Sequence, residues 1–481
     1  MNSNIKHLKN CWILPGFFGL MFTVLSCTGI EKSLQQNEQQ NQQQVEHKLA
    51  RMASAAGQLD SPMVKSLAYQ VIVNNDTLDV WQETCYDLDQ NGGQTDVHTA
   101  LFKYVPGTQV KIICNSAFSN FTLSPKRLNI PVVKNGNELT FSIPEYYNYA
   151  LAIPGRAPLL LFGSPDYSAY KPGAVVFAKG IHYGVNGVFK LESNKTYYLE
   201  EGAILRGKVL IENVSNVKLI GRGYIDDRTA PVAGNFVKVY RSQNVELRGF
   251  GVRHAALGWQ VDMVNSSNVN VSHLNLLSFG QNNDGLDLGS GCQDVHFSHC
   301  FIGSGDDGFG WHATNAAADG ETPLLNCSAH DCMIWKNQVG VGIRIGSSLE
   351  TSSVEQLTFK DIDIAKMTWG GHSVAIPHSD WADVRNITFE GIRDETIGNT
   401  RFVLMYIKQN SNSNPVYRPG TISNIRFIDC VSSATAATFE GYDAEHMIKD
   451  VTFKNVKVGG RNMLQSDIVA NSFTSNITVV D

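Results

Sequence analysis

Three carboxylates stand in two short turns of this 481-residue chain. Asp284 belongs to Asn282-Asn283-Asp284-Gly285, and Asp306 and Asp307 belong to Gly305-Asp306-Asp307-Gly308. Carboxylates that lie close together repel, so one can keep its proton while another stays ionised. Such a pair can work as general acid and general base. Because Asp-Gly is a common turn dipeptide, the two turns carry this meaning only if the fold brings them together.

A repeat around these turns predicts such a fold. From residue 213 onward, a polar residue followed by alternating apolar residues recurs, as in Asn216-Val217-Lys218-Leu219. The central apolar residues of the repeats are Val217, Val245, Val269, Val295, Cys327, Leu357, Ile387, Ile425 and Val451. Their uneven spacing is a solenoid period with insertions in its loops. Alternation with period 2 predicts strands, and no single unit can bury its apolar face alone. We therefore predict an all-β fold, a right-handed parallel β-helix.

A second row of strands follows the first at a similar offset and carries the carboxylates. Within this row Asp284, Asp307, Val341 and His372 fall in one column. Neighbouring strands lie ~4.8 Å apart, so Asp284 and Asp307 should be adjacent, with Asp306 beside them. The competing interpretation is a structural ladder of polar turn residues. Because stacked carboxylates repel, a purely structural ladder would favour Asn.

At these residues the chain resembles two families of pectin-lyase-like β-helix enzymes, glycoside hydrolase families 28 (polygalacturonases) and 49 (dextranases and isopullulanases). Both carry an Asn-x-Asp-Gly turn and, about one coil later, an Asp-Asp pair, which here are Asn282–Gly285 and Asp306-Asp307. The resemblance extends from about Pro172 to the C-terminus. It implies hydrolysis of a glycosidic bond, with Asp306 as the acid and with Asp284 and Asp307 holding the attacking water. An inverting enzyme usually separates acid and base by ~6.5–9.5 Å.

Two departures favour family 49 and a neutral α-glucan, dextran-like or pullulan-like. Family 28 carries Gly-His-Gly on the coil after the Asp pair, where this chain has Gly340-Val341-Gly342. It also carries an Arg-Ile-Lys that binds the uronate carboxylate, where this chain has Tyr406-Ile407-Lys408. Loss of a bidentate guanidinium weakens recognition of an acidic sugar. Residues 62–171 also alternate without the solenoid period, which predicts the β-sandwich that resemblance to family 49 implies.

Six further side chains are candidates for holding sugar hydroxyls or stacking on a sugar ring: Lys408, Tyr406, Arg344, His312, His372 and Trp311. A buried structural role is an equal alternative for Arg344, which alternates away from Val341, and Trp311 could belong to the core. Three other functions stay open. They are a polygalacturonase-like pectin hydrolase, a polysaccharide lyase and a non-catalytic glycan-binding lipoprotein.

We expect no metal and no cofactor. The segment from Asp87 to Gly92 resembles the start of a calcium loop, but His98 stands where the Glu at position twelve would be. Nucleic acid is not expected as a partner, since the net charge is -6 with only 17% charged residues and no basic stripe. The expected partner is a polysaccharide substrate.

The start of the chain predicts export. Lys6 and Lys9 precede an apolar run, and Val24-Leu25-Ser26-Cys27 forms a lipobox typical of bacterial lipoproteins, with an ordinary signal peptide as the alternative. We predict a signal peptide at 1–26, lipidation at Cys27, a Gln-rich tether at 27–61, the β-sandwich domain at 62–171 and a catalytic β-helix domain at 172–481. The protein would be a monomer anchored by lipid alone to the bacterial outer membrane, on its periplasmic or cell-surface face.

The cysteines of the repeats are expected to pack in the core. Cys300, Cys332 and Cys430 occupy the same place in the repeat unit, and free Cys is among the most buried residue types. A disulfide between Cys300 and Cys332, and another between Cys85 and Cys114, are alternatives that the sequence leaves open.

Overall fold

The computed structural model describes residues 63–86, 94–145, 147–229, 231–368, 371–396, 401–416 and 418–481. The predicted signal peptide, the lipidation site Cys27, the tether and the segment from Asp87 to Gly92 lie outside these residues. Residues 55–481 cluster into one compact unit. Within the described ranges, no helix is both long enough and apolar enough to cross a membrane.

The N-terminal part of this unit is built from two small sheets. Its strands are β1 (Met63–Lys65), β2 (Tyr69–Val73), β3 (Asp76–Thr77), β4 (Val80–Tyr86), β5 (Gln94–Lys103), β6 (Gln109–Cys114), β7 (Thr122–Ser124), β8 (Val133–Asn135), β9 (Glu138–Ser142), β10 (Asn148–Ala152) and β11 (Leu159–Ser164). One sheet has the order β1-β4-β5-β11-β10-β7 and the other the order β3-β2-β6-β9-β8. Buried residues of both sheets share one apolar core, for example Val71 of β2 and Phe102 of β5. This part is therefore a β-sandwich, as predicted.

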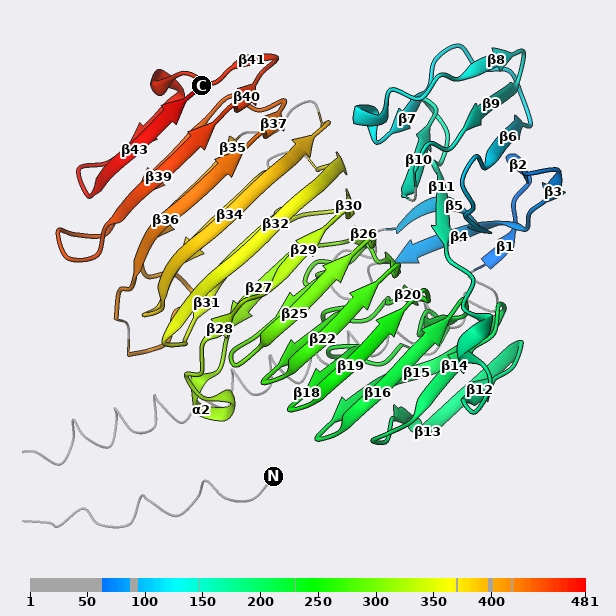
Figure 1. Cartoon of the computed structure of the whole chain (residues 1–481), viewed down its shortest axis with the longest axis horizontal. Helices are drawn as coiled ribbons and strands as arrows, with labels where there is room; N and C mark the ends of the chain where they lie inside the picture. The colour runs from blue at the N-terminus through cyan, green and yellow to red at the C-terminus, as the bar shows by residue number, and fades with distance from the viewer. Residues whose placement is uncertain are drawn as a thin grey trace, which may run out of the picture. The chain divides into compact units, whose positions relative to one another are not determined.

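The rest of the chain forms one continuous sheet of stacked, mostly parallel strands, which Figure 1 shows in sequence order from β12 to β43. The row that carries the apolar anchors consists of β12 (Val175–Phe177), β14 (Thr196–Leu199), β16 (Ser215–Gly221), β19 (Gln243–Arg248), β22 (Ser267–Ser272), β25 (Gln293–Ser298), β28 (Leu324–Leu325), β29 (Ser328–His330), β32 (Ser353–Lys366), β34 (Asp383–Asp394), β36 (Thr421–Ile428), β39 (Ile448–Lys454) and β43 (Thr474–Val480). Along this row Val217 pairs with Val245, Val245 with Val269, and Val269 with Val295. The predicted parallel β-helix is confirmed.

A second row of strands forms the face that carries the carboxylates. It consists of β13 (Gly180–Lys190), β15 (Ala203–Glu212), β18 (Val237–Tyr240), β21 (Val261–Val264), β24 (Leu286–Leu288), β27 (Phe309–Ala313), β31 (Ile343–Leu349), β33 (His372–His378), β35 (Arg401–Ile407), β38 (Ala437–Glu440) and β42 (Ile468–Ala470). A third row packs against the sandwich through residues such as Phe301 and Trp335. It consists of β17 (Tyr224–Asp226), β20 (Gly251–Arg253), β23 (Asn275–Leu277), β26 (Phe301–Ser304), β30 (Met333–Lys336), β37 (Val431–Ser432) and β40 (Lys457–Val458).

Few other elements occur in the described residues. The short β41 (Arg461–Asn462) pairs antiparallel with β40. The helical turns are α2 (Ala316–Asp319) and three 3₁₀ turns, η1 (Lys126–Leu128), η2 (Ser168–Tyr170) and η3 (Gln465–Asp467).

The repeat has a physical reason at each of its positions. The polar residue that opens many repeats adopts a positive φ, as at Asn216 (57°) and Asn244 (56°), a conformation that Asn tolerates better than most side chains. Its amide also bonds the next rung, since Asn244 Nδ2 donates to Asn216 Oδ1 at 3.0 Å. Inside the helix, Phe389 stacks on Phe359 at 5.3 Å and on Phe427 at 4.8 Å between ring centroids. One rung thus fixes the register of the next.

The repeat cysteines line the core as expected. Cys300 and Cys332 are buried free thiols on adjacent coils, and Cys300 N lies 3.4 Å from Cys332 Sγ. Cys85 and Cys114 are also free and buried, in the sandwich. Burial raises the pKa of the Cys85 thiol to about 12, so it is not an accessible nucleophile.

Candidate active site

The carboxylates form the predicted column. They lie just before strands of the second row, Asp284 before β24 and Asp306 and Asp307 before β27. Gly285 N donates to the carbonyl of Asp307 at 2.9 Å, and Gly308 N donates to that of Val341 at 2.9 Å. Gly342 N continues the series with a hydrogen bond to the carbonyl of His372 at 3.0 Å. Asp284 and Asp307 therefore lie on adjacent rungs. Asp306 precedes Asp307 in the same turn.

The three carboxylates meet closely. Oxygens of Asp284, Asp306 and Asp307, one from each residue, all lie within 4.8 Å of one another. This is shorter than the ~6.5–9.5 Å that usually separates acid and base in inverting enzymes. One water at ordinary hydrogen-bond distances of ~2.8 Å can still touch two oxygens that are this far apart. The cluster can therefore hold a water between two of its carboxylates.

Each carboxylate of the Asp306-Asp307 pair is held differently. Asp306 Oδ2 accepts a hydrogen bond from Asn282 N at 2.9 Å. Asp307 Oδ1 accepts from Val341 N at 2.6 Å, and Oδ2 accepts from Arg344 Nη1 at 2.7 Å. Asp307 is thus tied to a cation and Asp306 is not. The two neighbours in sequence are prepared for opposite protonation states.

The pKa values of Asp306 and Asp307 change in opposite directions from that of an ordinary Asp. Burial, together with the charges of Asp307 and Asp284, raises the pKa of Asp306 to about 6. Burial alone would also raise the pKa of Asp307, but the charges of Arg344 and Lys336 outweigh it and hold this pKa below its ordinary value. Burial and the charge of Asp307 raise the pKa of Asp284 well above its usual range. Such separation lets one carboxyl keep its proton while its neighbour is ionised, as acid–base catalysis requires.

Lys336 is a buried cation near the carboxylates that the sequence analysis did not single out. It ends β30, is fully buried, and its Nζ donates to Ser304 Oγ at 3.3 Å. Burial lowers its pKa, while Asp306 and Asp307 oppose that change. It follows three apolar residues at the end of a strand in another row, so no sequence pattern connects it with the site.

Next to the three carboxylates lies a second polar group, formed by Asp287 and His312. His312 Nε2 is 3.4 Å from Asp284 Oδ2 and 3.8 Å from Asp287 Oδ1, and its ring stacks on Trp259 at 5.2 Å between centroids. Burial and then Arg344 lower the pKa of His312 to about 4, so the ring is neutral at ordinary pH. Asp287 was also missed, although it alternates with the core residues Leu286 and Leu288 and so points outward.

Gly310 leaves room for the side chains of Asp284, Asp287 and His312. A Cβ at this position would lie 2.2 Å from Asp287 Oδ1, 2.8 Å from His312 Nε2 and 2.9 Å from Asp284 Oδ2. Any larger residue would therefore displace a side chain of the site. Asp284, Asp287 and His312 also bring ligand atoms within 4.8 Å of one another, a donor set that divalent transition metals accept.

These residues surround a pocket of about 320 Å³. Its lining residues are Trp259, Asn282, Asp284, Asp306, Asp307, His312, Thr314, Arg344, Ser347, Ser348 and Asn412. Of the six side chains predicted to contact the sugar, His312 and Arg344 line it. Arg344 alternates with the core residues Ile343 and Ile345, so it points outward, and its guanidinium pairs with Asp307 through Nη1.

The other four predicted contacts are not among the residues that line this pocket. Trp311 is fully buried and packs on Phe359 at 4.3 Å between ring centroids, so the prediction that it stacks on a sugar is wrong. His372 begins β33, beyond Val341. Tyr406 and Lys408 belong to the coil of β35, two coils beyond β31, and Lys408 Nζ lies 3.7 Å from Glu440. The residue beside Arg344 on β33 is Ala375, which carries no charge.

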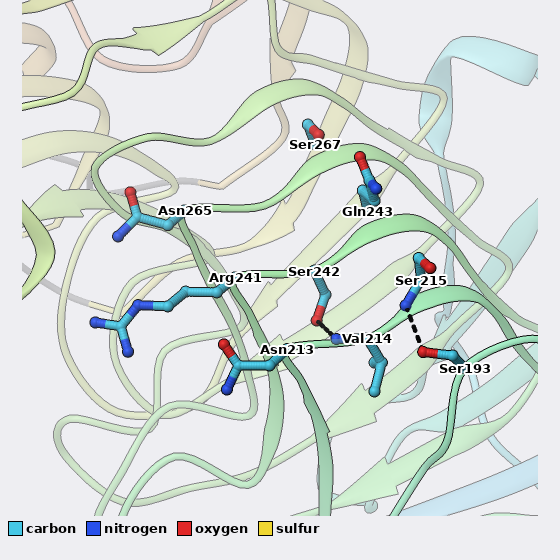
Figure 2. A pocket seen from close by; sticks show the side chains of 9 residues that line it. All are labelled: Ser193, Asn213, Val214, Ser215, Arg241, Ser242, Gln243, Asn265 and Ser267. Carbon is cyan, nitrogen blue, oxygen red and sulfur yellow. Dashed lines mark hydrogen bonds between the residues drawn. The ribbon is translucent and has the colours of Figure 1, made fainter.

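A second hollow, of about 420 Å³, lies over the turns between early coils and has a different character (Figure 2). Its hydroxyls serve the backbone of the turns. Ser242 Oγ accepts from Val214 N at 3.2 Å, and Ser193 Oγ accepts from Ser215 N at 3.1 Å. Arg241 is the only charged residue in its lining. This hollow has no pair of acid and base and follows from the stacking of polar turns.

The parallel β-helix and its three outward-facing carboxylates fit one class of protein, the β-helix glycoside hydrolases. Residues 189–476 match the family described as glycosyl hydrolases family 28, and the chain belongs to that family. The match bears out the predicted relationship to the families 28 and 49. Of these two, the sequence analysis favoured family 49, whereas the matching family is 28.

Several solved structures resemble the chain at low sequence identity. Dex49A from Penicillium minioluteum is 11% identical, with a TM-score of 0.49 over 87% of this chain and 95% of that one. An exopolygalacturonase from Thermotoga maritima is 14% identical, with a TM-score of 0.45 over 63% and 83%. Endopolygalacturonase I from Stereum purpureum is 14% identical, with a TM-score of 0.38 over 64% and 95%. No curated protein matches the sequence.

Proposed function

We propose that this glycoside hydrolase cleaves a neutral α-glucan, dextran-like or pullulan-like, with inversion at the anomeric carbon. Asp306 donates its proton to the glycosidic oxygen as the bond to the anomeric carbon breaks. Asp307 removes a proton from the attacking water, which Asp284 helps to orient. Asp306 ends ionised and Asp307 protonated, so one proton must pass back through solvent before the next turnover.

The choice of a neutral sugar rests on how the positively charged side chain of the pocket is paired. Arg344 is the one Lys or Arg among the residues that line the pocket, and its guanidinium is already paired with Asp307. A uronate would need a guanidinium or ammonium group of its own to balance its charge. The next coil offers Ala375 beside Arg344. A carboxylate-bearing sugar would therefore find no cation in the pocket lining that is not already paired with a carboxylate of the site.

A pectin hydrolase of the polygalacturonase type is the second candidate, and the observation that favours it is the match to family 28. The two candidates differ in one measurable property. Purified protein is incubated separately with dextran, pullulan and polygalacturonate, and the products are separated by chromatography. Release of reducing oligosaccharides from dextran or pullulan supports the proposal, and faster hydrolysis of polygalacturonate overturns it. An unsaturated uronide product would indicate a lyase, and binding without any product a glycan-binding lipoprotein.

We also propose that the mature protein is an exported monomer anchored through a lipid on Cys27 to the outer membrane. The lipobox Val24-Leu25-Ser26-Cys27 and the basic and apolar residues before it support this proposal. Cys27→Ala should move the protein from the membrane fraction to the soluble fraction of the expressing cells. An unchanged distribution would contradict lipid anchoring.

A further inference from the structure

A cleft of about 820 Å³, more than twice the volume of the active-site pocket, lies where the sandwich meets the first coils of the β-helix. Its sandwich side is formed by Met63, Lys65, Thr77, Leu78, Asp79, Trp81 and Leu101. Its β-helix side is formed by Lys179, Ile181, Glu201, Gly202, Ile204, Arg206, Tyr224 and Asp226. None of these residues lines the active-site pocket. The two sites are therefore separate.

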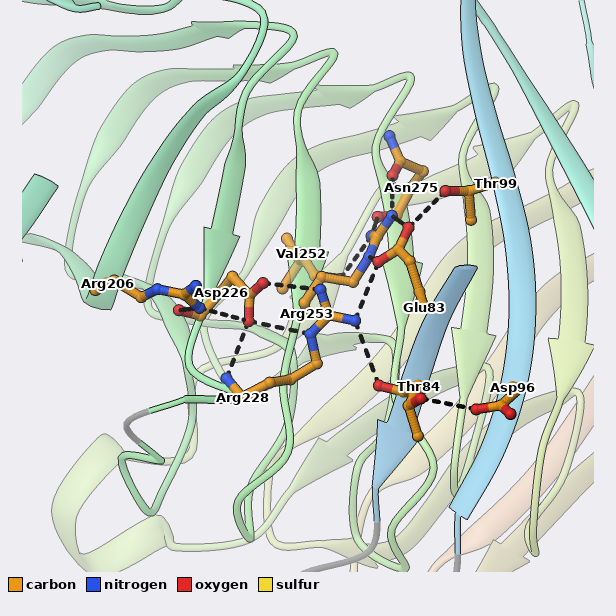
Figure 3. A network of polar contacts seen from close by, with 10 residues as sticks. All are labelled: Glu83, Thr84, Asp96, Thr99, Arg206, Asp226, Arg228, Val252, Arg253 and Asn275. Atoms are coloured by element: carbon orange, nitrogen blue, oxygen red, sulfur yellow. Dashed lines mark hydrogen bonds and ion pairs between the residues drawn. The ribbon is translucent and has the colours of Figure 1, made fainter. Parts of the chain in front are cut away.

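Buried ion pairs hold the two sides of this cleft together (Figure 3). Glu83 of β4 lies between two arginines of the β-helix, with Oε2 2.6 Å from Arg253 Nε and 3.1 Å from Arg228 Nη1. Arg228 Nη2 in turn contacts Asp226 Oδ2 at 2.8 Å, and Asp226 Oδ1 contacts Arg206 Nη1 at 3.2 Å. These five side chains are at most 8% exposed. Because Arg206 and Asp226 line the cleft, buried ion pairs hold this part of its wall in place.

The charges that line the cleft cancel. Lys65, Lys179 and Arg206 face Asp79, Glu201 and Asp226, so the net charge of the lining is zero. Lys65 pairs with Asp79, Arg206 with Asp226, and Glu201 with Arg222 outside the lining. A charged ligand would therefore meet a lining without net charge, in which Lys179 is the one charged side chain with no ion pair among the described residues. Paired charged groups can still exchange hydrogen bonds with hydroxyls.

Apart from Thr77 and the buried Tyr224, the remaining lining is apolar, and it includes one partly exposed aromatic ring. Trp81 is half-buried, with Lys65 Nζ 4.3 Å from its ring centroid, and Ile181 on the opposite side is 52% exposed. A rigid surface that combines an aromatic ring, aliphatic side chains and a few oriented polar groups suits a ligand with apolar faces and hydroxyl edges. A pyranose ring has that character.

We propose that this cleft is a second glycan-binding site, which holds an uncharged segment of polysaccharide away from the catalytic pocket. The site raises the time that the enzyme spends on a polymer, because a chain bound there keeps its other segments at high local concentration near the pocket. The inference uses the glycoside hydrolase class of the chain and does not depend on which glucan is cleaved. It gives the sandwich a role in binding, since Trp81 and Asp79 belong to it.

Affinity electrophoresis of the full chain tests this site. The protein carries Asp306→Asn to prevent hydrolysis and migrates through native gels without polymer or with dextran, pullulan or polygalacturonate. We expect retardation by dextran or pullulan, and we expect Trp81→Ala to weaken it by about tenfold in apparent Kd, or 1.4 kcal/mol. Ile181→Glu should act in the same direction, and its exposure makes it harmless to folding. Tyr442→Ala, an exposed aromatic residue after β38, is the matched control and should migrate like its parent.

Three results would overturn the proposal. They are no retardation of the Asp306→Asn parent by dextran or pullulan, equal retardation of the parent and both cleft variants, and a dependence on Trp81 seen with polygalacturonate alone. Melting temperatures of the variants show whether an effect of Trp81→Ala comes from unfolding, in which case Ile181→Glu decides. Hydrolysis of polygalacturonate in the product assay would overturn the proposed substrate without altering this result.

Discussion

Replacing Arg344 by Met should impair the base and leave the acid in place. The guanidinium nitrogen lies 2.7 Å from Asp307 Oδ2, and the two side chains are only 22% and 1% exposed. Charges about 4 Å apart in an effective dielectric of about 20 interact by about 4 kcal/mol. Without that interaction Asp307 holds its proton more tightly, so the base is ionised in a smaller fraction of molecules. At 1.36 kcal/mol per factor of ten, this loss raises the proton affinity of Asp307 by about 10³-fold, starting from a pKa below its ordinary value, so we expect kcat at about pH 5 to fall by about 10- to 50-fold.

The assay is the rate of reducing-end release from the polymer that the wild type cleaves, measured as kcat and KM across a pH series. Arg344→Met should raise the pH at which the acidic limb of the profile reaches half of its maximum. Arg344→Lys is the matched control because it keeps the charge while it loses the planar donors, and we expect it to retain within about tenfold of wild-type kcat. An Arg344→Met enzyme with an unchanged acidic limb and a raised KM alone would show that Arg344 binds substrate and does not tune Asp307.

Three further predictions concern the acid Asp306, the glycine at position 310 and the core of the β-helix. Because the pKa of Asp306 is raised to about 6, the protonated acid is present below that pH and lost above it. We therefore expect kcat/KM to fall as the pH rises through about 6, and a rate that stays level to pH 8 would contradict this role. Gly310→Ala would place a Cβ 2.2 Å from Asp287 Oδ1, so we expect activity to drop at least tenfold while circular dichroism stays unchanged, and a fully active variant would refute the crowding. Phe389→Ala removes a ring stacked on Phe359, which should lower the free energy of unfolding by about 3–5 kcal/mol in urea titration; a loss below about 1 kcal/mol would show that the stack is not tightly packed.

The fold could be predicted from sequence because the β-helix repeats its constraint at every coil. Val217, Val245 and Val269 each need the same neighbour above and below, so the period survives even where the loops between coils change in length. The polar residue at the start of each repeat is a second signal in the sequence, because Asn tolerates the left-handed conformation in which one turn ends and the next strand starts. The same regularity placed Asp284 beside Asp307.

The surroundings of the carboxylates were predicted less well, and the reasons are local. Trp311 was a candidate for sugar contact with the core as its alternative, and the inward parity that it shares with Phe309 across Gly310 could have decided for the core. Tyr406-Ile407-Lys408, which is similar to Arg-Ile-Lys, lies two coils beyond β31, and the coil between them carries Ala375 beside Arg344. The pairing of Arg344 with Asp307 and the burial of Lys336 depend on side-chain directions across several coils, which a linear pattern does not contain.

The central claim is that Asp306 is the proton donor of a hydrolytic site that acts on a neutral glycan. The most direct test compares wild type with Asp306→Asn on two substrates. One is dextran or pullulan, and the other is an aryl α-glucoside that the wild type accepts and whose leaving group needs no proton. Asp284→Asn is the matched variant. Acid assistance contributes roughly 10²–10⁴-fold, so Asp306→Asn should lose at least that factor on polymer and much less on the aryl substrate, whereas Asp284→Asn should lose activity on both. Equal losses of Asp306→Asn on both substrates, or near-normal cleavage of the polymer, would contradict the account.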